Sequence, residues 1–204
     1  SSDLLVGALA AGELEISGGW IQGSGTMTIG EQGLVTGSGN ISIATLNTGT
    51  VELAAWQSLN FSNGYNQSAA GSATIQENAT LQIGGGGQLA GTLINRGRLL
   101  VSDGTFTLNT PLHGSGAPDG GLSVNGEFSV HAPVSASDVN VFAGSMHVLE
   151  DITANTMSVE YGSIYQTTGG VETNELNIRQ ASYALSAPAS LIAGQVNVFG
   201  SFEH

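Results

Sequence analysis

A short polar segment at residues 60–73 holds the side chains best suited to bind a ligand. Its candidate binding residues are Asn63, Tyr65, Asn66 and Gln67. Amide side chains both donate and accept hydrogen bonds, and a tyrosine adds an apolar ring with a polar hydroxyl at its edge. Such a set suits contact with a sugar or a protein, particularly where a loop leaves a rigid scaffold. The alternative is that the segment is an ordinary solvent loop.

Groups that could catalyse a reaction are sparse. The chain has no cysteine and no lysine, and its basic residues are Arg96, Arg98 and Arg179. The four histidines lack the spacing of metal ligands, and no Gly-x-Ser-x-Gly phrase marks a nucleophile. The sequence therefore predicts a non-catalytic protein without a cofactor. Calcium at Glu150 and Asp151 is the one open alternative, because hard cations favour carboxylate oxygens in loops.

The charge of the chain argues against two classes of partner. Sixteen acidic residues against three basic ones give a formal net charge of −13. Nucleic acids bind proteins mainly through Lys and Arg, which neutralise phosphates and release counterions. Anionic membrane surfaces attract the same residues, and no apolar run approaches the roughly 18 residues that a membrane span needs. We therefore expect no nucleic-acid partner and no direct membrane insertion.

A repeated phrase indicates which elements position these groups. A turn residue and a polar residue precede an apolar, a polar and an apolar residue, for example at 25–29, 39–43, 104–108 and 126–130. Apolar residues at every second position indicate a strand with one buried face. No long stretch has the period of about 3.6 residues that an amphipathic helix requires. The chain is therefore predicted to be all-β.

Apolar residues also recur along the C-terminal half with a common longer period. One ladder, with nearly equal steps, is Leu122, Val139, Met157, Leu176 and Val196. A second ladder runs two positions later through Val124, Val141, Val159, Ile178 and Val198. Two more are Phe128, Met146, Ile164, Tyr183, Phe202 and Val134, Ile152, Val171, Leu191. Residues one period apart would lie about 4.8 Å above one another in stacked parallel strands.

Small and polar columns complete the pattern of a coil. A glycine-rich column, expected at a corner where the backbone bends or takes a positive φ, is Gly126, Gly144, Gly162, Ala181 and Gly200. An outward polar column is Ser123, Asn140, Ser158, Asn177 and Asn197. Crossovers between parallel strands of one sheet are right-handed in ~98% of cases. The predicted fold is a right-handed parallel β-helix, or β-solenoid, with three short strands per coil of roughly 18–20 residues.

The N-terminal half follows the same strand order less regularly. Successive coils are predicted to pass through Leu46, Val51, Leu59, then Ile75, Leu81, Leu89, then Ile94, Leu99, Phe106. This alignment leaves one insertion at 60–73 and a second at 109–120. We expect residues 1–204 to form a single solenoid domain, as part of a longer surface protein.

The evenly spaced ladders, together with phrases such as Gly-Thr-Leu-Ile-Asn-Arg-Gly-Arg-Leu at 91–99, resemble the β-helical passenger regions of bacterial autotransporters and filamentous-haemagglutinin-type secreted proteins. The likeness spans most of the chain and is one of pattern. It implies a secreted or cell-surface stalk, on the bacterial outer surface, used for adhesion or display.

Fold and resemblance together predict a non-catalytic, extracellular structural or adhesive module that displays binding loops on a rigid stalk. Its expected partners are a host or cell-surface protein or glycan, and neighbouring β-solenoid segments of the same chain. The alternative is a carbohydrate-active β-helix, such as a polysaccharide lyase or hydrolase, or a glycan-binding module. Enzymes of that kind need clustered carboxylates, and Glu150 and Asp151 have no acidic residue one coil later.

Overall fold

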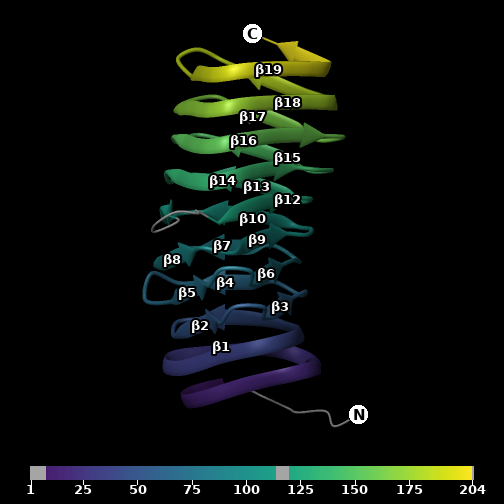
Figure 1. Cartoon of the computed structure of the whole chain (residues 1–204). Coiled ribbons are helices and arrows are strands. Elements are labelled where there is room, and N and C mark those ends of the chain that lie inside the picture. Colours follow the sequence, from purple (N-terminus) through teal and green to yellow (C-terminus); the bar gives the residue numbers. More distant parts are fainter. Residues whose placement is uncertain (1–7, 114–119, 204) are drawn as a thin grey trace.

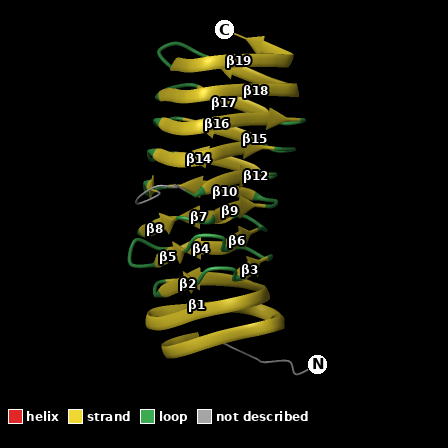
Figure 2. Ribbon diagram, viewed as in Figure 1, coloured by secondary structure: helices red, strands yellow, loops and turns green. Residues whose placement is uncertain are grey.

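The computed structural model describes residues 8–113 and 120–203, and every regular element in them is a β-strand (Figures 1 and 2). The strands form one 19-stranded parallel sheet. This sheet winds into a column of about eight turns with ~19 residues per turn. The strands are β1 (Ala8–Asn47), β2 (Thr50–Leu53), β3 (Ser58–Phe61), β4 (Tyr65–Gln67), β5 (Ser72–Ile75), β6 (Thr80–Ile83), β7 (Gly87–Leu89), β8 (Thr92–Asn95), β9 (Arg98–Val101), β10 (Thr105–Leu108), β11 (Leu112–His113), β12 (Gly121–Val124), β13 (Glu127–Val130), β14 (Val134–Val141), β15 (Ser145–Val148), β16 (Ile152–Glu160), β17 (Ser163–Gln166), β18 (Gly170–Leu185) and β19 (Ser190–Glu203).

Each coil has three faces, as the sequence predicts. Face A contains β2, β5, β8 and β11, face B contains β3, β6, β9 and β12, and face C contains β4, β7, β10, β13, β15 and β17. Faces A and B are joined in one continuous strand in β14 and β16. All three faces are joined in β18, and all three are again present in β19.

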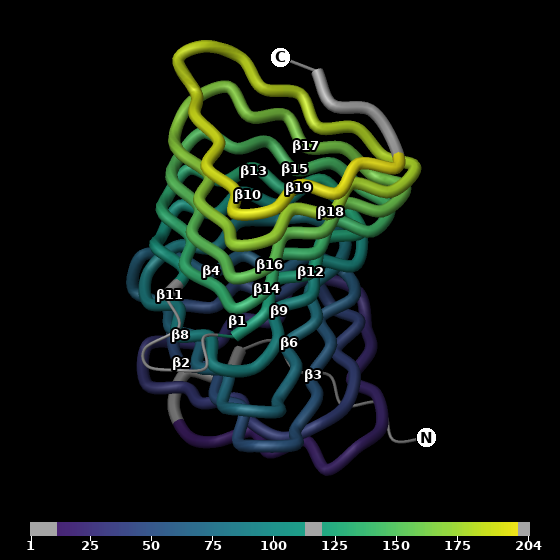
Figure 3. Tube along the Cα trace, turned by 45° about the horizontal axis from the view of Figure 1, so that its top comes forward, coloured from purple at the N-terminus to yellow at the C-terminus, as the bar shows by residue number. Residues whose placement is uncertain are grey.

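The solenoid is right-handed. In Figure 1 the chain rises from β1 to β19, and the near strands, such as β16, run from left to right. Figure 3, with the top of the column turned forward, shows the last coil passing counter-clockwise as it approaches the viewer. This is the handedness expected from the twist of β-strands.

The apolar ladders predicted for the C-terminal half are confirmed residue by residue. Val141 pairs with Val159, Val159 with Ile178, and Ile178 with Val198. On face C, Phe128 pairs with Met146 and Met146 with Ile164. Equivalent side chains therefore lie over one another along the axis and form continuous apolar columns.

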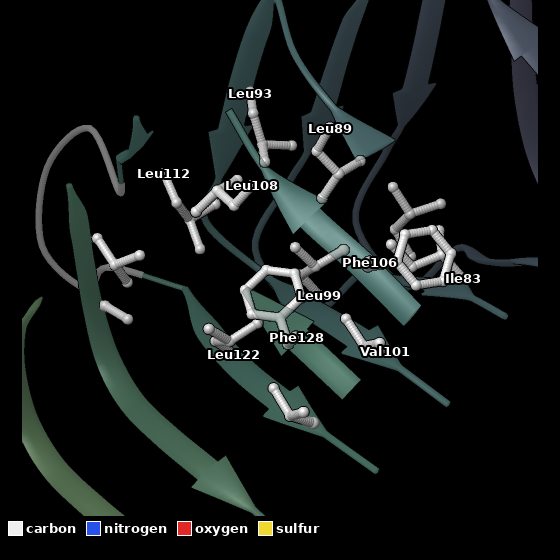
Figure 4. Close-up of a cluster of buried hydrophobic side chains, with 14 of the residues drawn as sticks. Ile83, Leu89, Leu93, Leu99, Val101, Phe106, Leu108, Leu112, Leu122 and Phe128 are labelled. Atoms are coloured by element: carbon white, nitrogen blue, oxygen red, sulfur yellow. The ribbon is translucent and has the colours of Figure 1, made fainter. Parts of the chain in front are cut away.

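These columns fill the interior of the solenoid. Figure 4 shows part of it, with Leu99, Leu122, Phe106 and Phe128 directed inward from faces B and C. All four side chains are fully buried. Burying one such side chain contributes about 1.5–3 kcal/mol, so the stability of the fold is spread evenly along the column.

The glycine column at the corner before face C has a different cause from the one expected. None of Gly126, Gly144 and Gly162 has a positive φ. An added Cβ on Gly126 would lie 2.6 Å from Gly104 O, and one on Gly162 would lie 2.7 Å from Gly144 O. Stacked corners approach so closely that a side chain would meet the backbone of the coil below. Glycine is required here by close packing.

The predicted insertion at 60–73 is wrong. The segment contains β4 and the ends of β3 and β5, and these three strands pair in register with the next coil. Leu46, predicted to lie inward, is 37% exposed. The inward residue of β8 is Leu93, while Ile94 faces outward. The strands of all three faces show the same alternation of apolar and polar residues. Where fewer than three apolar columns can be aligned, the sequence does not show which face a strand belongs to or which of its residues point inward.

The second predicted insertion, at 109–120, includes positions 114–119, which lie outside the described residues. On face C, Phe106 pairs with Phe128, and Phe128 in turn pairs with Met146. The first of these steps along the chain is longer than the second. The same holds on face B, where the step from β9 to β12 exceeds the step from β12 to β14. The coil that contains β10 and β11 is therefore longer than the coil that follows it.

Candidate functional site

The four candidate binding residues of the sequence divide between the interior and the surface. Tyr65 and Gln67 are fully buried, so neither can contact a ligand from solvent. Asn63 and Asn66 are exposed. The reason is the alternation of β4, whose successive residues point inward, outward and inward. The prediction of a contact surface that includes Tyr65 and Gln67 is therefore corrected.

Tyr65 and Gln67 instead complete a buried polar network with Asn47. Asn47 Nδ2 donates to Tyr65 OH at 2.9 Å and to Ser72 O at 3.0 Å. Tyr65 OH donates to Gln67 Oε1 at 3.1 Å, and Gln67 Nε2 donates to Thr92 O at 3.0 Å. Burial raises the pKa of the Tyr65 hydroxyl far above its usual range, and the Asn47 hydrogen bond only partly opposes this. The network stabilises the turn from face C to face A.

The same device recurs near the other end of the column. Tyr183 OH donates to Gln166 Oε1 at 2.6 Å, and Gln166 Nε2 donates to Gly169 O at 3.1 Å and Ser190 O at 2.7 Å. Burial also raises the pKa of Tyr183 well above the usual range for a tyrosine. Buried carboxamides thus satisfy backbone carbonyls at corners, where the strand ladder is interrupted and the carbonyls would otherwise be unpaired.

Asp151, weighed for calcium, and Glu160 both have partners within the chain. Asp151 Oδ1 accepts a hydrogen bond from Gly170 N at 2.7 Å, at the corner of the next coil. Glu160 forms an ion pair of 3.8 Å with Arg179, whose side chain is 60% exposed. Within residues 8–113 and 120–203, no three His, Cys, Asp or Glu side chains come close enough together to hold a metal ion.

Face B presents an outward column of mostly polar, uncharged side chains, interrupted by Leu100, which we call the amide ladder. Its members, in register from coil to coil, are Asn40, Asn60, Gln82, Leu100, Ser123, Asn140, Ser158, Asn177 and Asn197. The register of the five predicted from the sequence is confirmed, although Ser123 is buried. The structure extends the column toward β1. Amides also bond along the axis: Asn60 Nδ2 donates to Asn40 Oδ1 at 3.0 Å, and Asn197 Nδ2 to Asn177 Oδ1 at 2.9 Å.

Exposed aromatic side chains line the corner between faces B and C beside this ladder. Phe142, Tyr161 and Phe199, which we call the aromatic corner, are 51%, 63% and 72% exposed. The Phe142 and Tyr161 rings meet edge to face with centroids 5.9 Å apart. Tyr161 has a φ of 58°, a conformation that bulky residues rarely adopt. Strain of this kind costs roughly 1–3 kcal/mol and is concentrated at functional sites.

Sequence reasoning missed Phe142 and Phe199. A usable signal was present, since Phe142 directly follows Val141 and Phe199 directly follows Val198. Both valines belong to one inward ladder, so an apolar residue immediately after them breaks the alternation and must face solvent. The same break at equivalent positions of two coils marks a surface feature.

Open hollows run along this surface. One of about 510 Å³ lies between Arg98, Asn140, Phe142 and Glu160. A second of about 400 Å³ is lined by Glu160, Tyr161, Arg179, Gln180 and Phe199. Glu160 lines both, so the two hollows are neighbours along the aromatic corner, and we refer to them together as the groove. A third hollow, of about 310 Å³ at the corner of faces A and B, shares Arg98 with the first.

Comparison with known proteins identified no matching family model, no matching curated protein and no matching solved structure. No helix in the part of the chain that the structure describes has the length and hydropathy needed to cross a membrane. The evidence for the fold is therefore the strand pairing within this chain, and the evidence that bears on function is the groove.

Proposed function

We propose that this chain is a non-catalytic adhesive module that binds a glycan along face B. The observation that carries the proposal is the side-by-side run of the amide ladder and the aromatic corner. Amides and hydroxyls supply both donors and acceptors for sugar hydroxyl groups. Aromatic rings supply flat apolar surfaces for the C–H faces of pyranose rings. Neither element alone would favour sugars over other ligands.

The spacing of the groups suits a polymer that lies parallel to the solenoid axis. Neighbouring coils are about 4.8 Å apart, which is close to the length of one sugar unit in an extended chain. The amide ladder repeats once per coil from Asn40 to Asn197. An extended oligosaccharide would therefore meet a polar side chain at most successive units, the exceptions being Leu100 and the buried Ser123. Affinity would accumulate along its length.

The proposed setting is the outer surface of a bacterium. A column of stacked coils makes a stiff stalk, and the sequence pattern resembles passenger regions of autotransporters and filamentous-haemagglutinin-type proteins. We propose that the chain is secreted or displayed at the cell surface, where its partner is a host or cell-surface glycan. The binding element in this proposal is a strand face, in place of the displayed loops first expected.

A second proposed partner is a neighbouring β-solenoid coil of the same kind. Val196 and Val198 belong to inward columns, yet they are 47% and 43% exposed on β19. A coil with the same alternation, stacked on β19, would cover both valines and pair with the open backbone edge. Such a contact would leave the face B groove free for its ligand.

A glycan array with the labelled protein, followed by calorimetric titration of the best oligosaccharide, tests the proposal. We expect binding that strengthens with oligosaccharide length. The double variant Phe142→Ala/Tyr161→Ala should weaken it by about tenfold or more, equivalent to roughly 1.4 kcal/mol. Tyr165→Ala, which removes an exposed ring on face C, is the matched control and should bind like wild type.

Two outcomes would overturn the proposal. The first is a complete absence of binding to neutral or acidic glycans on the array. The second is turnover, seen as new reducing or unsaturated ends after incubation with a polysaccharide panel. Turnover would reassign the groove to a polysaccharide lyase or hydrolase.

A further inference from the structure

We infer that Arg98 forms a subsite for a single oxyanion, the carboxylate of an acidic sugar or a sulfate ester, within the glycan bound on face B. The inference rests on the proposed function and adds the chemical class of one sugar unit. It comes from the position and the partners of one guanidinium group. Arg98 is the one residue that lines both the first and the third hollow.

The guanidinium of Arg98 is held in place by a neutral group. Arg98 Nε and Nη2 donate to Ser123 Oγ at 3.0 Å and 2.6 Å. Ser123 is 5% exposed and lies in β12, where every residue is buried. The serine thus orients the arginine without neutralising it. In the described residues, the structure gives Arg98 no carboxylate within ion-pair distance.

Acidic side chains also line these two hollows. Asp138, which lines the third hollow, accepts from Ser137 Oγ at 2.9 Å and from Asn140 Nδ2 at 2.6 Å. Glu160, which lines the first hollow, is paired with Arg179. Glu77 lines the third hollow with Arg96. Among the residues that the structure describes, none of these carboxylates forms an ion pair with Arg98. The guanidinium therefore stays available to an added anion, on a protein whose net charge is −13.

An oriented guanidinium is the preferred partner of planar oxyanions, because its N–H groups can bind two oxygens at once. A uniformly charged polyanion would be repelled by the remaining acidic surface. A mostly neutral glycan with an isolated acidic unit would not, since repulsion is screened beyond roughly 8 Å at physiological ionic strength. The amides and Phe142 would hold the neutral units, and Arg98 would fix the register of the chain.

The test compares one oligosaccharide in three forms: with a uronic acid carboxylate, with that carboxyl reduced to an alcohol, and with a sulfate ester at the same unit. Calorimetry should show wild type binding at least one anionic form about tenfold more tightly than the reduced form. Arg98→Gln should abolish this difference, because it should weaken binding of the anionic form by about tenfold and binding of the reduced form by much less. Arg98→Lys should retain part of the preference, because it keeps the charge but loses bidentate geometry.

Gln88→Glu is the control for net charge, because it also adds one unit of negative charge, on the exposed part of face C. It should leave the preference intact. The carboxylate and sulfate arms identify which oxyanion is recognised. Equal binding of all three forms by wild type would overturn the Arg98 subsite and leave glycan binding standing. A parallel loss of every form in Arg98→Gln would also overturn it. Failure of all three forms to bind would instead refute the proposed function.

Discussion

Replacing Tyr65 by phenylalanine tests whether this residue belongs to the core or to a binding surface. The change removes one oxygen, which accepts from Asn47 and donates to Gln67. Asn47 Nδ2 keeps Ser72 O as an acceptor at 3.0 Å, and also donates to Gln67 Oε1 at 3.4 Å. No buried polar atom is therefore left without a partner. Two lost hydrogen bonds at a net value of about 0.5–1.5 kcal/mol each, partly offset by the remaining partners, predict a loss of about 1–2 kcal/mol.

Urea unfolding followed by circular dichroism measures this loss. Tyr65→Ala also removes the ring, which packs on Phe61 with centroids 4.6 Å apart, and should cost about 3–5 kcal/mol. Tyr165→Phe removes a hydroxyl from an exposed ring and should change stability by less than about 0.5 kcal/mol. If Tyr65→Phe were as stable as wild type but lost glycan binding, Tyr65 would have to be a ligand contact.

Alkaline pH should destabilise the fold through the same residue. The folded state raises the pKa of the Tyr65 hydroxyl above its unfolded value of 10.0. The unfolded state therefore loses its proton first, and binds fewer protons than the folded state above about pH 10. Because stability falls with pH wherever the unfolded state binds fewer protons, the contribution is full below pH 10 and declines above it. Urea midpoints of wild type at pH 9 and 11 should differ by more than those of Tyr65→Phe; equal differences would contradict the assignment.

Two further substitutions test the packing of the coils. Gly144→Ala places a Cβ against the carbonyl oxygen of Gly126 and should lower the free energy of unfolding by about 1–3 kcal/mol; a variant as stable as wild type would refute close packing as the reason for the glycine. Leu122→Ala empties a fully buried position and should cost about 2–5 kcal/mol. Leu100→Ala, on the outward column of the adjacent strand, should cost far less in the same urea titration, and an equal cost would contradict the assigned register.

The sequence predicted the strand register correctly where several apolar ladders could be aligned in the same coil. Between β14 and β19, apolar columns on all three faces share one period, so the partner of Val159 could be assigned as Ile178 and is so in the structure. Toward the N-terminus only single ladders could be aligned, and one ladder does not determine to which face of the solenoid a strand belongs. Leu89 was matched with Phe106, whereas it pairs with Leu108.

The candidate site was predicted less well than the fold. Tyr65 and Gln67 have the polar groups of a binding loop, but their alternation in β4 turns them inward. At the corners of the coil, backbone carbonyls lack strand partners, and buried polar side chains can donate hydrogen bonds to them. Residue type alone does not distinguish this structural role from ligand binding. Phe142 and Phe199 have the opposite character, since they are apolar residues placed outward at a corner.

The sequence by itself determined the strand alternation and the coil length, because these follow from a period of two within each strand and about 19 between equivalent strands of successive coils. It also predicted the right-handed sense, because crossovers between parallel strands are right-handed. Only the tertiary structure decided which residues from different coils meet. Arg98 and Ser123 are 25 residues apart in the chain, yet their side chains are in contact. Their meeting depends on the number of residues in the intervening coil, and that register is set by packing of the whole column.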